Sequence, residues 1–163
     1  MRIGLFNDYR PGIVKDDQIV DFGQVLSQPI PENPQDLIRL IIENWDSISG
    51  EVQSYVKKQN GVPLSSVKIQ SPLPRPNKII CMAVNYLEAE NQEMPAIDAF
   101  LKDSDCVVGD WDTVYLDPKC EARIFHHEAE LAIVIGKTAA NVDEDSAMDY
   151  VFGYTGFMDV SGR

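Results

Sequence analysis

The sequence predicts a mixed α/β fold that is rich in strands, and three observations lead to this prediction. Hydrophobic residues make up 44% of the 163 residues and charged residues 25%, a balance typical of globular chains. Short apolar runs separated by turn residues, which are typical of strands, recur near both ends of the chain. Between them, the segment after Asn33 carries apolar residues at helical spacing. The length suits one ordinary domain, or a small domain joined to part of another.

The N-terminal segment predicts a small antiparallel sheet. Residues 3–6 form a short apolar run that a turn follows. Residues 12–15 and 18–21 then predict the two arms of a hairpin, with the Asp16-Asp17 pair at its turn.

Two helices are expected after this sheet. Asn33 is a candidate N-cap with Pro34 at the first helical position, and the helical spacing of apolar residues begins at Leu37. A second helix is expected over about residues 49–59, and the Asn-Gly pair at 60–61 ends it.

Three prolines predict a boundary between domains. Pro72, Pro74 and Pro76 alternate with other residues and make a stiff, extended connection. We therefore expect an N-terminal α/β domain over residues 1–72 and a second domain over residues 77–163. The elements expected in the second domain are a first strand at 78–83, short strands at 105–111 and 113–116, a long strand at 126–136 and a helical stretch at 147–151.

The long strand at 126–136 opens with two carboxylates, Glu128 and Glu130. Alternate side chains of a strand share a face, so both glutamates lie on the same side as His126. After Glu130 both faces are apolar, which indicates a strand that enters a core. Two acidic groups there are costly unless something neutralises them, as a hard divalent cation would. The alternative is a strand end whose carboxylates lie in water, and the pattern by itself does not decide.

A third carboxylate, Asp159, lies between apolar residues and is expected to be half buried. Taken alone, it is more simply explained by pairing with Arg163 or by capping a turn.

Charge, cysteines and motifs exclude several classes of protein. A net charge of -12 repels phosphate backbones, so we expect no nucleic acid partner. Cys81, Cys106 and Cys120 lack the spacing of a zinc site or a disulfide framework, and Cys81 is predicted to be a small buried hydrophobic residue. The phosphate-binding, nucleophilic-serine, HExxH and dinucleotide motifs do not occur. Without a signal peptide or an apolar run that spans a bilayer, we expect a cytoplasmic protein and no membrane partner.

Several segments match, in chain order, the motifs of one known family. They are residues 78–81 with Asn85-Tyr86, the pair Phe100 and Lys102 of an FxK element, the ExE strand at 127–137, and residues 147–155 followed by a DxSxR motif at 159–163. These segments resemble the fumarylacetoacetate hydrolase superfamily, and the resemblance extends over the whole chain.

The resemblance implies a metal centre and a fold. The family binds Mg²⁺ or Mn²⁺ through the glutamates of the ExE strand and the aspartate of the DxSxR motif, which are Glu128, Glu130 and Asp159 here. It also implies that the second domain is an incomplete catalytic domain with a mixed β-sheet.

The resemblance further implies a hydrolase, lyase or isomerase of catabolism that acts on a small 2-oxo or 1,3-dicarbonyl acid, such as an acylpyruvate. The metal would polarise the carbonyl of this acid and stabilise an enolate. Lys102 is a candidate catalytic residue near the substrate carboxylate or an anionic oxygen, and the alternative is a surface lysine.

One departure concerns the acid/base group. Many members carry a histidine three residues after the Asn-Tyr pair and a glutamate three residues further on, and Ala89 and Gln92 occupy these places here. We name Glu90 as the candidate catalytic base, although nothing in the sequence selects it over Glu88 and Glu93. The departure puts hydrolysis in question, as distinct from decarboxylation, isomerisation or dehydration.

The other departure concerns length. The family's catalytic domain continues for roughly another hundred residues, about the size of an ordinary domain, beyond the place where this chain ends. We therefore expect a truncated or split protein that binds the metal weakly or not at all by itself. Its partner would be a second copy, in a homodimer, or a complementing chain. The alternative is a non-catalytic remnant that acts as a binding or dimerising module.

Overall fold

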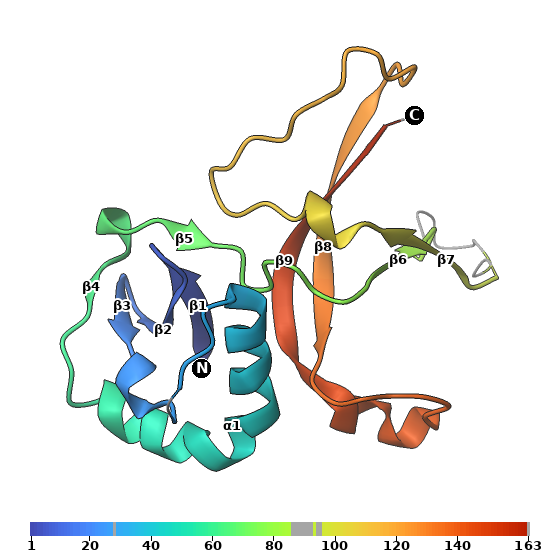
Figure 1. The fold of residues 1–163 in the computed structure, drawn as a ribbon. Coiled ribbons are helices and arrows are strands. Elements are labelled where there is room, and N and C mark those ends of the chain that lie inside the picture. The colour runs from blue at the N-terminus through green and yellow to red at the C-terminus, as the bar shows by residue number, and fades with distance from the viewer. Residues whose placement is uncertain (28, 86–92, 94–95, 163) are drawn as a thin grey trace.

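The computed structural model describes residues 1–27, 29–85, 93 and 96–162. Figure 1 shows two lobes that meet along the helix α1 (Pro34–Val56). One lobe holds a small sheet beside this helix, and the other holds two separate pairs of strands. The division into domains at residues 72 and 77 remains a prediction.

The sheet of the first lobe has five strands in the order β4-β3-β2-β1-β5, each antiparallel to its neighbours. Their bounds are Arg2–Phe6 (β1), Arg10–Lys15 (β2), Gln18–Asp21 (β3), Val62–Pro63 (β4) and Ile69–Gln70 (β5), with short 3₁₀ helices at Gly23–Val25 (η1) and Leu64–Ser66 (η2). The predicted hairpin is confirmed, because β2 pairs with β3. Asp16 in its turn has a φ of 53°, a left-handed conformation that aspartate tolerates in tight turns.

The predicted N-cap of α1 is confirmed. The side chain of Asn33 accepts hydrogen bonds from the backbone N–H groups of Gln35, at 2.9 Å, and Asp36, at 3.2 Å. Pro34 begins the helix, where its missing N–H costs nothing because the first N–H groups of a helix have no partner within it. The sequence therefore determines where this helix begins.

The prediction of two separate helices is wrong, since α1 is one helix of 23 residues. No proline interrupts the segment, and the glycine within it, Gly50, costs only about 1 kcal/mol relative to alanine. Ile41 and Val52, on either side of the expected break, are both fully buried. Burial on one continuous face outweighs the local cost of this glycine.

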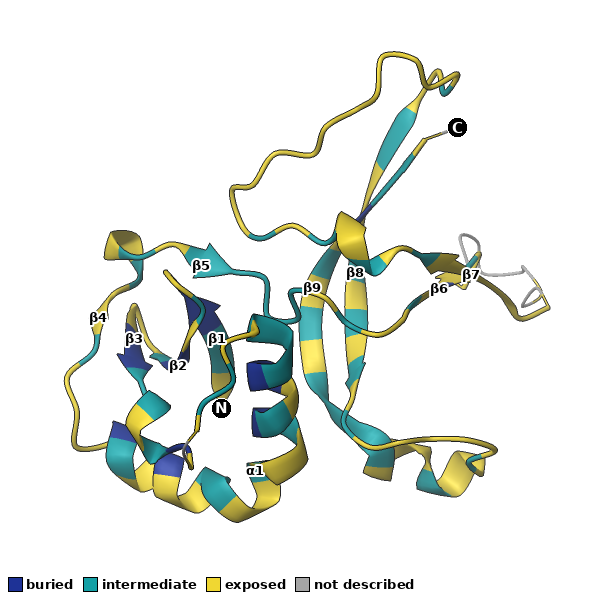
Figure 2. Cartoon of the chain, viewed as in Figure 1, coloured by how far each residue is buried: buried dark blue, intermediate teal, exposed yellow. Residues whose placement is uncertain are grey.

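The hydrophobic core lies between α1 and the sheet of the first lobe, where the buried residues gather in Figure 2. Leu5 of β1, Phe22 after β3 and Ile41 of α1 are each 0% exposed. Truncating such a residue to alanine typically costs about 2–5 kcal/mol. The first lobe therefore supplies most of the buried apolar packing of the described chain.

The second lobe consists of two antiparallel strand pairs. Strand β6 (Ile79–Ala83) pairs with β7 (Asp98–Lys102), and β8 (Phe125–Ile135) pairs with β9 (Val151–Gly162). Two 3₁₀ helices, η3 (Ser104–Cys106) and η4 (Glu144–Tyr150), follow β7 and precede β9. The predicted strands at 78–83 and 126–136 are confirmed, and the helical stretch near 147–151 is a 3₁₀ helix that ends at Tyr150.

The prediction of short strands at 105–111 and 113–116 is wrong. The structure has η3 and a loop there, and Trp111 and Tyr115 are 96% and 90% exposed. An apolar run becomes a strand only when a neighbouring strand completes its hydrogen bonds and a surface covers its side chains. The described residues provide neither for this segment.

The expectation that β8 enters a core is also wrong for the described chain. Leu131, Ile133 and Ile135 share one face of the strand and are 62%, 57% and 55% exposed. With more than half of each side chain exposed, this face is largely uncovered by the other described residues. The sequence pattern correctly predicts an apolar face on β8, but local sequence does not indicate which surface packs against that face.

Side-chain contacts join α1 to the long strand pair. Trp45 of α1 meets Phe152 of β9 edge to face, with ring centroids 6.1 Å apart. Just after β8, an added Cβ at Gly136 would lie 3.5 Å from the side chain of Ile42 of α1, an ordinary contact distance. The first lobe therefore supports the strand pair that carries the acidic residues described below.

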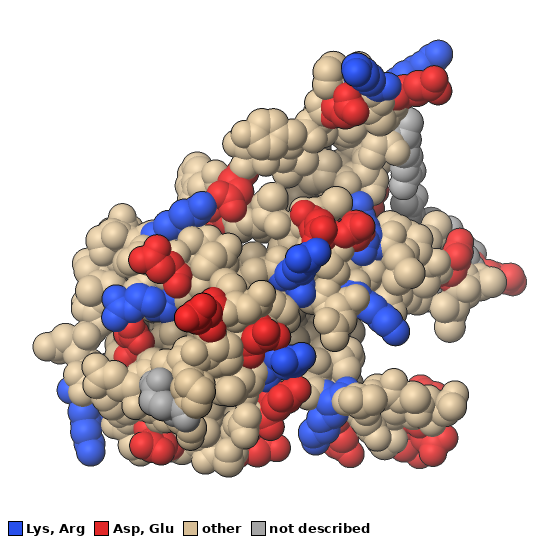
Figure 3. Space-filling model, in the orientation of Figure 1, with Lys and Arg blue, Asp and Glu red and all other residues tan. Residues whose placement is uncertain are grey.

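Among the described residues, no helix combines the length and the apolar character needed to cross a membrane. On the face shown in Figure 3, acidic and basic side chains are mixed over both lobes. On this face, the net charge of -12 is spread and does not form one acidic patch.

Candidate metal centre

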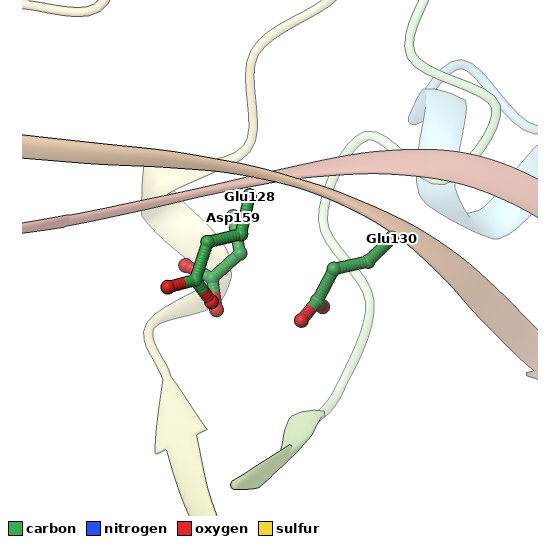
Figure 4. Close-up of side chains that lie close together, drawn as sticks. All are labelled: Glu128, Glu130 and Asp159. Carbon is green, nitrogen blue, oxygen red and sulfur yellow. The ribbon is translucent and has the colours of Figure 1, made fainter. Parts of the chain in front are cut away.

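The pairing of β8 with β9 brings three carboxylates together. The register sets Glu128 directly opposite Asp159, and Glu130 follows two residues later on the same face of β8. Each of the three offers an oxygen within 4.8 Å of the others. In Figure 4 the three side chains leave the two strands on the same side. Like charges directly opposite in a sheet repel each other, so this arrangement calls for a positive partner.

Asp159 is the most deeply placed member of this cluster. It is 1% exposed and is the only buried charged residue among those described. Its Oδ1 lies 2.5 Å from the Nζ of Lys102 and accepts a hydrogen bond from the Ser161 hydroxyl at 3.1 Å. The expected partner, Arg163, lies outside the described residues. The structure shows Asp159 as a buried, paired carboxylate, deeper than the half-buried position that the sequence predicted.

Lys102, at the end of β7, reaches across to β9. Besides pairing with Asp159, its ammonium donates to the carbonyl oxygen of Val160 at 2.9 Å and to the Ser161 hydroxyl at 3.2 Å. Its side chain is 22% exposed, and the Nζ lies 5.9 Å from the centre of the Phe100 ring. Lys102 is therefore not a surface lysine, because the β6–β7 pair places it at the carboxylate cluster.

Cys81 of β6 is a neighbour of the cluster that the sequence did not reveal. The prediction of burial is confirmed, since Cys81 is 5% exposed. Burial, and then the negative charge of Asp159 and a hydrogen bond to it, raise the pKa of the thiol to about 11. Cys81 pairs with Phe100, two residues before Lys102, and these three share one face of the β6–β7 pair. This alternation along the strands is the sequence signal that could have placed Cys81 on the same face as Lys102.

Glu130 shows the electrostatic strain of the cluster. Burial raises its pKa, the charges of Asp159 and Glu128 raise it further, and Lys102 acts in the opposite direction. Oxygen ligands from carboxylates are those that hard divalent cations such as Mg²⁺ and Mn²⁺ prefer. The donor set fits such an ion, which would relieve the repulsion among the three groups.

Two further residues border the cluster. The Nδ1 of His126 lies 3.6 Å from a carboxylate oxygen of Glu128, and His126 pairs with Ser161 across the strands. An open hollow of about 530 Å³ is lined by Lys102 and by segment 75–77 and residues 103–105, and the three carboxylates do not line it. Lys102 therefore lies between the acidic cluster and this hollow.

The predicted acid/base group falls outside what the structure describes. Glu90, Glu88, Ala89 and Gln92 all belong to residues 86–92, which lie outside the described residues. Of the predicted site residues, the structure brings together the three carboxylates and Lys102.

Fold and site together define a class: a strand-rich α/β protein with a candidate carboxylate metal centre on a two-stranded ribbon. The family model described as "Fumarylacetoacetate (FAA) hydrolase C-terminal" matches residues 78–163, which is more than half of the chain. The chain therefore belongs to the fumarylacetoacetate hydrolase family. The resemblance recognised in the motifs is confirmed.

Individual relatives agree with this assignment. The chain is 31% identical to a maleylpyruvate hydrolase of Aquipseudomonas alcaligenes, and the match covers 100% of this chain and 62% of the relative. It is also 31% identical to an oxaloacetate tautomerase of Bacillus subtilis, over 98% of this chain and 58% of the relative. The chain thus spans about three fifths of the length of these curated relatives.

Solved structures show the same fold. The crystal structure of a maleylpyruvate hydrolase from Sphingobium sp., in complex with manganese(II) and pyruvate, matches with a TM-score of 0.88 and 34% sequence identity. The match covers 100% of this chain and 60% of that one. The predicted class, a mixed and strand-rich α/β fold of this family, is confirmed.

Proposed function

We propose that this chain carries the metal centre of an enzyme that acts on a small 2-oxo or 1,3-dicarbonyl acid of the acylpyruvate kind. The observation that carries the proposal is the convergence of Glu128, Glu130 and Asp159 within 4.8 Å on paired strands. Membership of the family supports it, as do relatives that are named for maleylpyruvate and oxaloacetate.

We propose that the three carboxylates hold one Mg²⁺ or Mn²⁺ ion. Glu128 and Asp159 lie opposite each other and Glu130 lies beside them, so the ion would be bound from one side of the ribbon. When bound, such an ion polarises a carbonyl oxygen and stabilises an enolate. Ser161, Lys102 and the Cys81 thiol hold Asp159 in place, so that its carboxylate has a set orientation.

The proposed catalytic residues are Lys102 and Glu90. Lys102 carries its positive charge at the cluster and is also one of the residues that line the open hollow, so this charge would attract an anionic oxygen of the substrate. Glu90 remains the proposed base on the strength of the sequence alone. We further propose a cytoplasmic enzyme of catabolism that works as a homodimer or with a complementing chain.

Titration of the metal-free protein with Mn²⁺ tests the metal centre. We expect one weak site, with a dissociation constant in about the 0.1–1 mM range. The Asp159→Asn variant should abolish the site, and Glu121→Gln, an exposed glutamate in a loop, is the matched control. Equal binding by the wild type and Asp159→Asn would contradict the assignment of these ligands.

Assays with acylpyruvates and oxaloacetate test the reaction. Turnover that requires Mn²⁺ or Mg²⁺ and that is lost in Asp159→Asn supports the enzyme. The absence of turnover, together with intact metal binding, would favour the second candidate described next.

The second candidate is a non-catalytic module that binds a partner or dimerises. The exposed apolar face of β8, formed by Leu131, Ile133 and Ile135, favours it. Apolar faces of this kind mark interaction surfaces when they lie on a soluble chain. Clear metal-dependent turnover by this chain would exclude this candidate.

A further inference from the structure

Three hydrogen-bond acceptors fix the position of the Lys102 ammonium at the carboxylate cluster. Its Nζ lies 2.5 Å from Asp159, 2.9 Å from the carbonyl oxygen of Val160 and 3.2 Å from the Ser161 hydroxyl. An ammonium has three N–H donors, and three acceptors surround this one. With 22% exposure for the lysine side chain and 1% for the aspartate, water screens this charge poorly.

The charges of the cluster have a simple balance. Glu128, Glu130 and Asp159 supply three negative charges when ionised, and Lys102 supplies one positive charge. Two negative charges remain, which is the charge that a divalent cation neutralises.

We propose that Lys102 sets the charge of this centre and thereby lowers its preference for trivalent over divalent cations. This inference rests on the proposed metal centre and adds a determinant of its specificity. The lysine repels every cation at the site, and the repulsion grows in proportion to the charge of the ion. The repulsion by Lys102 is therefore about one and a half times as strong for a trivalent ion as for a divalent ion at the same position.

Removing this charge should change the preference between ions. Without the lysine charge, the three carboxylates would present three negative charges when ionised, which a trivalent cation neutralises. The role is one of selection, because Lys102 pairs with a proposed ligand and is not itself a ligand. Ions such as Fe³⁺ would then compete better for the centre.

The test compares Ca²⁺ with La³⁺, two hard ions of similar radius and different charge. Dissociation constants are measured by titration calorimetry at pH 8 for the wild type, Lys102→Met and Lys102→Arg. We expect Lys102→Met to shift the ratio of the two constants at least about tenfold in favour of La³⁺. Lys102→Arg keeps the charge and should stay within about twofold of the wild type, as should Lys119→Met, an exposed lysine in a loop.

The ratio of the two dissociation constants separates the effect of the lost lysine charge from the effect of a disturbed site structure. A ligand that turns away or takes up a proton weakens both ions, whereas lost repulsion favours the ion of higher charge. If Lys102→Met weakens both ions equally, or shifts the ratio toward Ca²⁺, the inference is wrong. If Lys102→Met fails to fold in a circular-dichroism check, Lys102→Gln carries the same prediction, because an amide still donates to Val160.

Failure of the proposed function would look different. If the wild type binds neither Mn²⁺, Ca²⁺ nor La³⁺ at millimolar concentration, the metal centre itself is refuted, and this inference with it. If the wild type binds these ions and the ratio does not respond to the charge of residue 102, only the inference is refuted.

Discussion

Glu130 is the residue at which the electrostatics of the cluster can be tested without any ligand. Its pKa is raised from the ordinary value of 4.5 by burial and by the neighbouring carboxylates. A folded state that holds a proton more tightly than the unfolded state loses stability as the pH rises. The penalty is absent below pH 4.5 and is complete above the raised pKa.

The Glu130→Gln variant removes this penalty. In the presence of EDTA, we expect its thermal unfolding midpoint to exceed that of the wild type by a few degrees at pH 8 and to equal it at pH 4. Glu121→Gln, in an exposed loop, should show no difference at either pH. A lower midpoint for Glu130→Gln at pH 8 would mean that the carboxylate stabilises the metal-free protein.

Cys81 and Lys102 show which properties of single residues can be predicted from the sequence and which cannot. The sequence indicated a buried cysteine and a candidate catalytic lysine, and both positions follow from the alternation of one strand pair. Their common contact with Asp159 was not predictable, because it depends on how β6–β7 packs against β8–β9. Propensity and pattern carry no information about such packing.

At the level of elements, the close approach of the end of β8 to Phe152 of β9 depends on a missing side chain. An added Cβ at Gly136 would lie 2.9 Å from Phe152 and 3.5 Å from Ile42, and the first distance is shorter than side chains tolerate. Gly153, on the opposite strand, has nothing within 4 Å of its own added Cβ. The two glycines therefore form a matched pair.

We expect Gly136→Ala to lower the free energy of unfolding by about 1–3 kcal/mol, because packed neighbours must shift. Gly153→Ala should change it by less than about 0.5 kcal/mol, since the site is open. Urea denaturation of both variants measures the difference. Similar losses for the two variants would show that the strand backbone, and not the close approach to Phe152, sets the cost.

Elements also show the limits of local signals. The Asn33 cap and the Asp16 turn were predicted because side-chain hydrogen bonds and tight turns involve neighbouring residues. Strand β9 was not predicted, because its glycines hide the alternation and only pairing with β8 makes it a strand. The continuity of α1 likewise depends on burial against the sheet.

At the scale of the whole molecule, the exposed face of β8 is the main open feature. Leu131, Ile133 and Ile135 lie together on the strand and are more than half exposed. We expect the chain to associate as its concentration rises, because this face is removed from water by association.

The variant Ile133→Lys should reduce this association in sedimentation velocity experiments while leaving the thermal midpoint within about 2 °C of the wild type. Val62→Lys, an exposed valine in the other lobe, is the control and should associate like the wild type. Unchanged association in Ile133→Lys would exclude this face as the contact.

The strand-rich α/β class, the cap and hairpin of the first lobe, and the family, through motifs that occur in order, could all be predicted from the sequence. It also put Glu128 and Glu130 on one face, because a strand repeats every two residues. That Asp159 lies opposite Glu128, and that Lys102 contacts both Asp159 and Ser161, became known only from the three-dimensional structure. These relations join residues distant in the chain, and they exist because strand pairing and burial, which are non-local, bring the residues together.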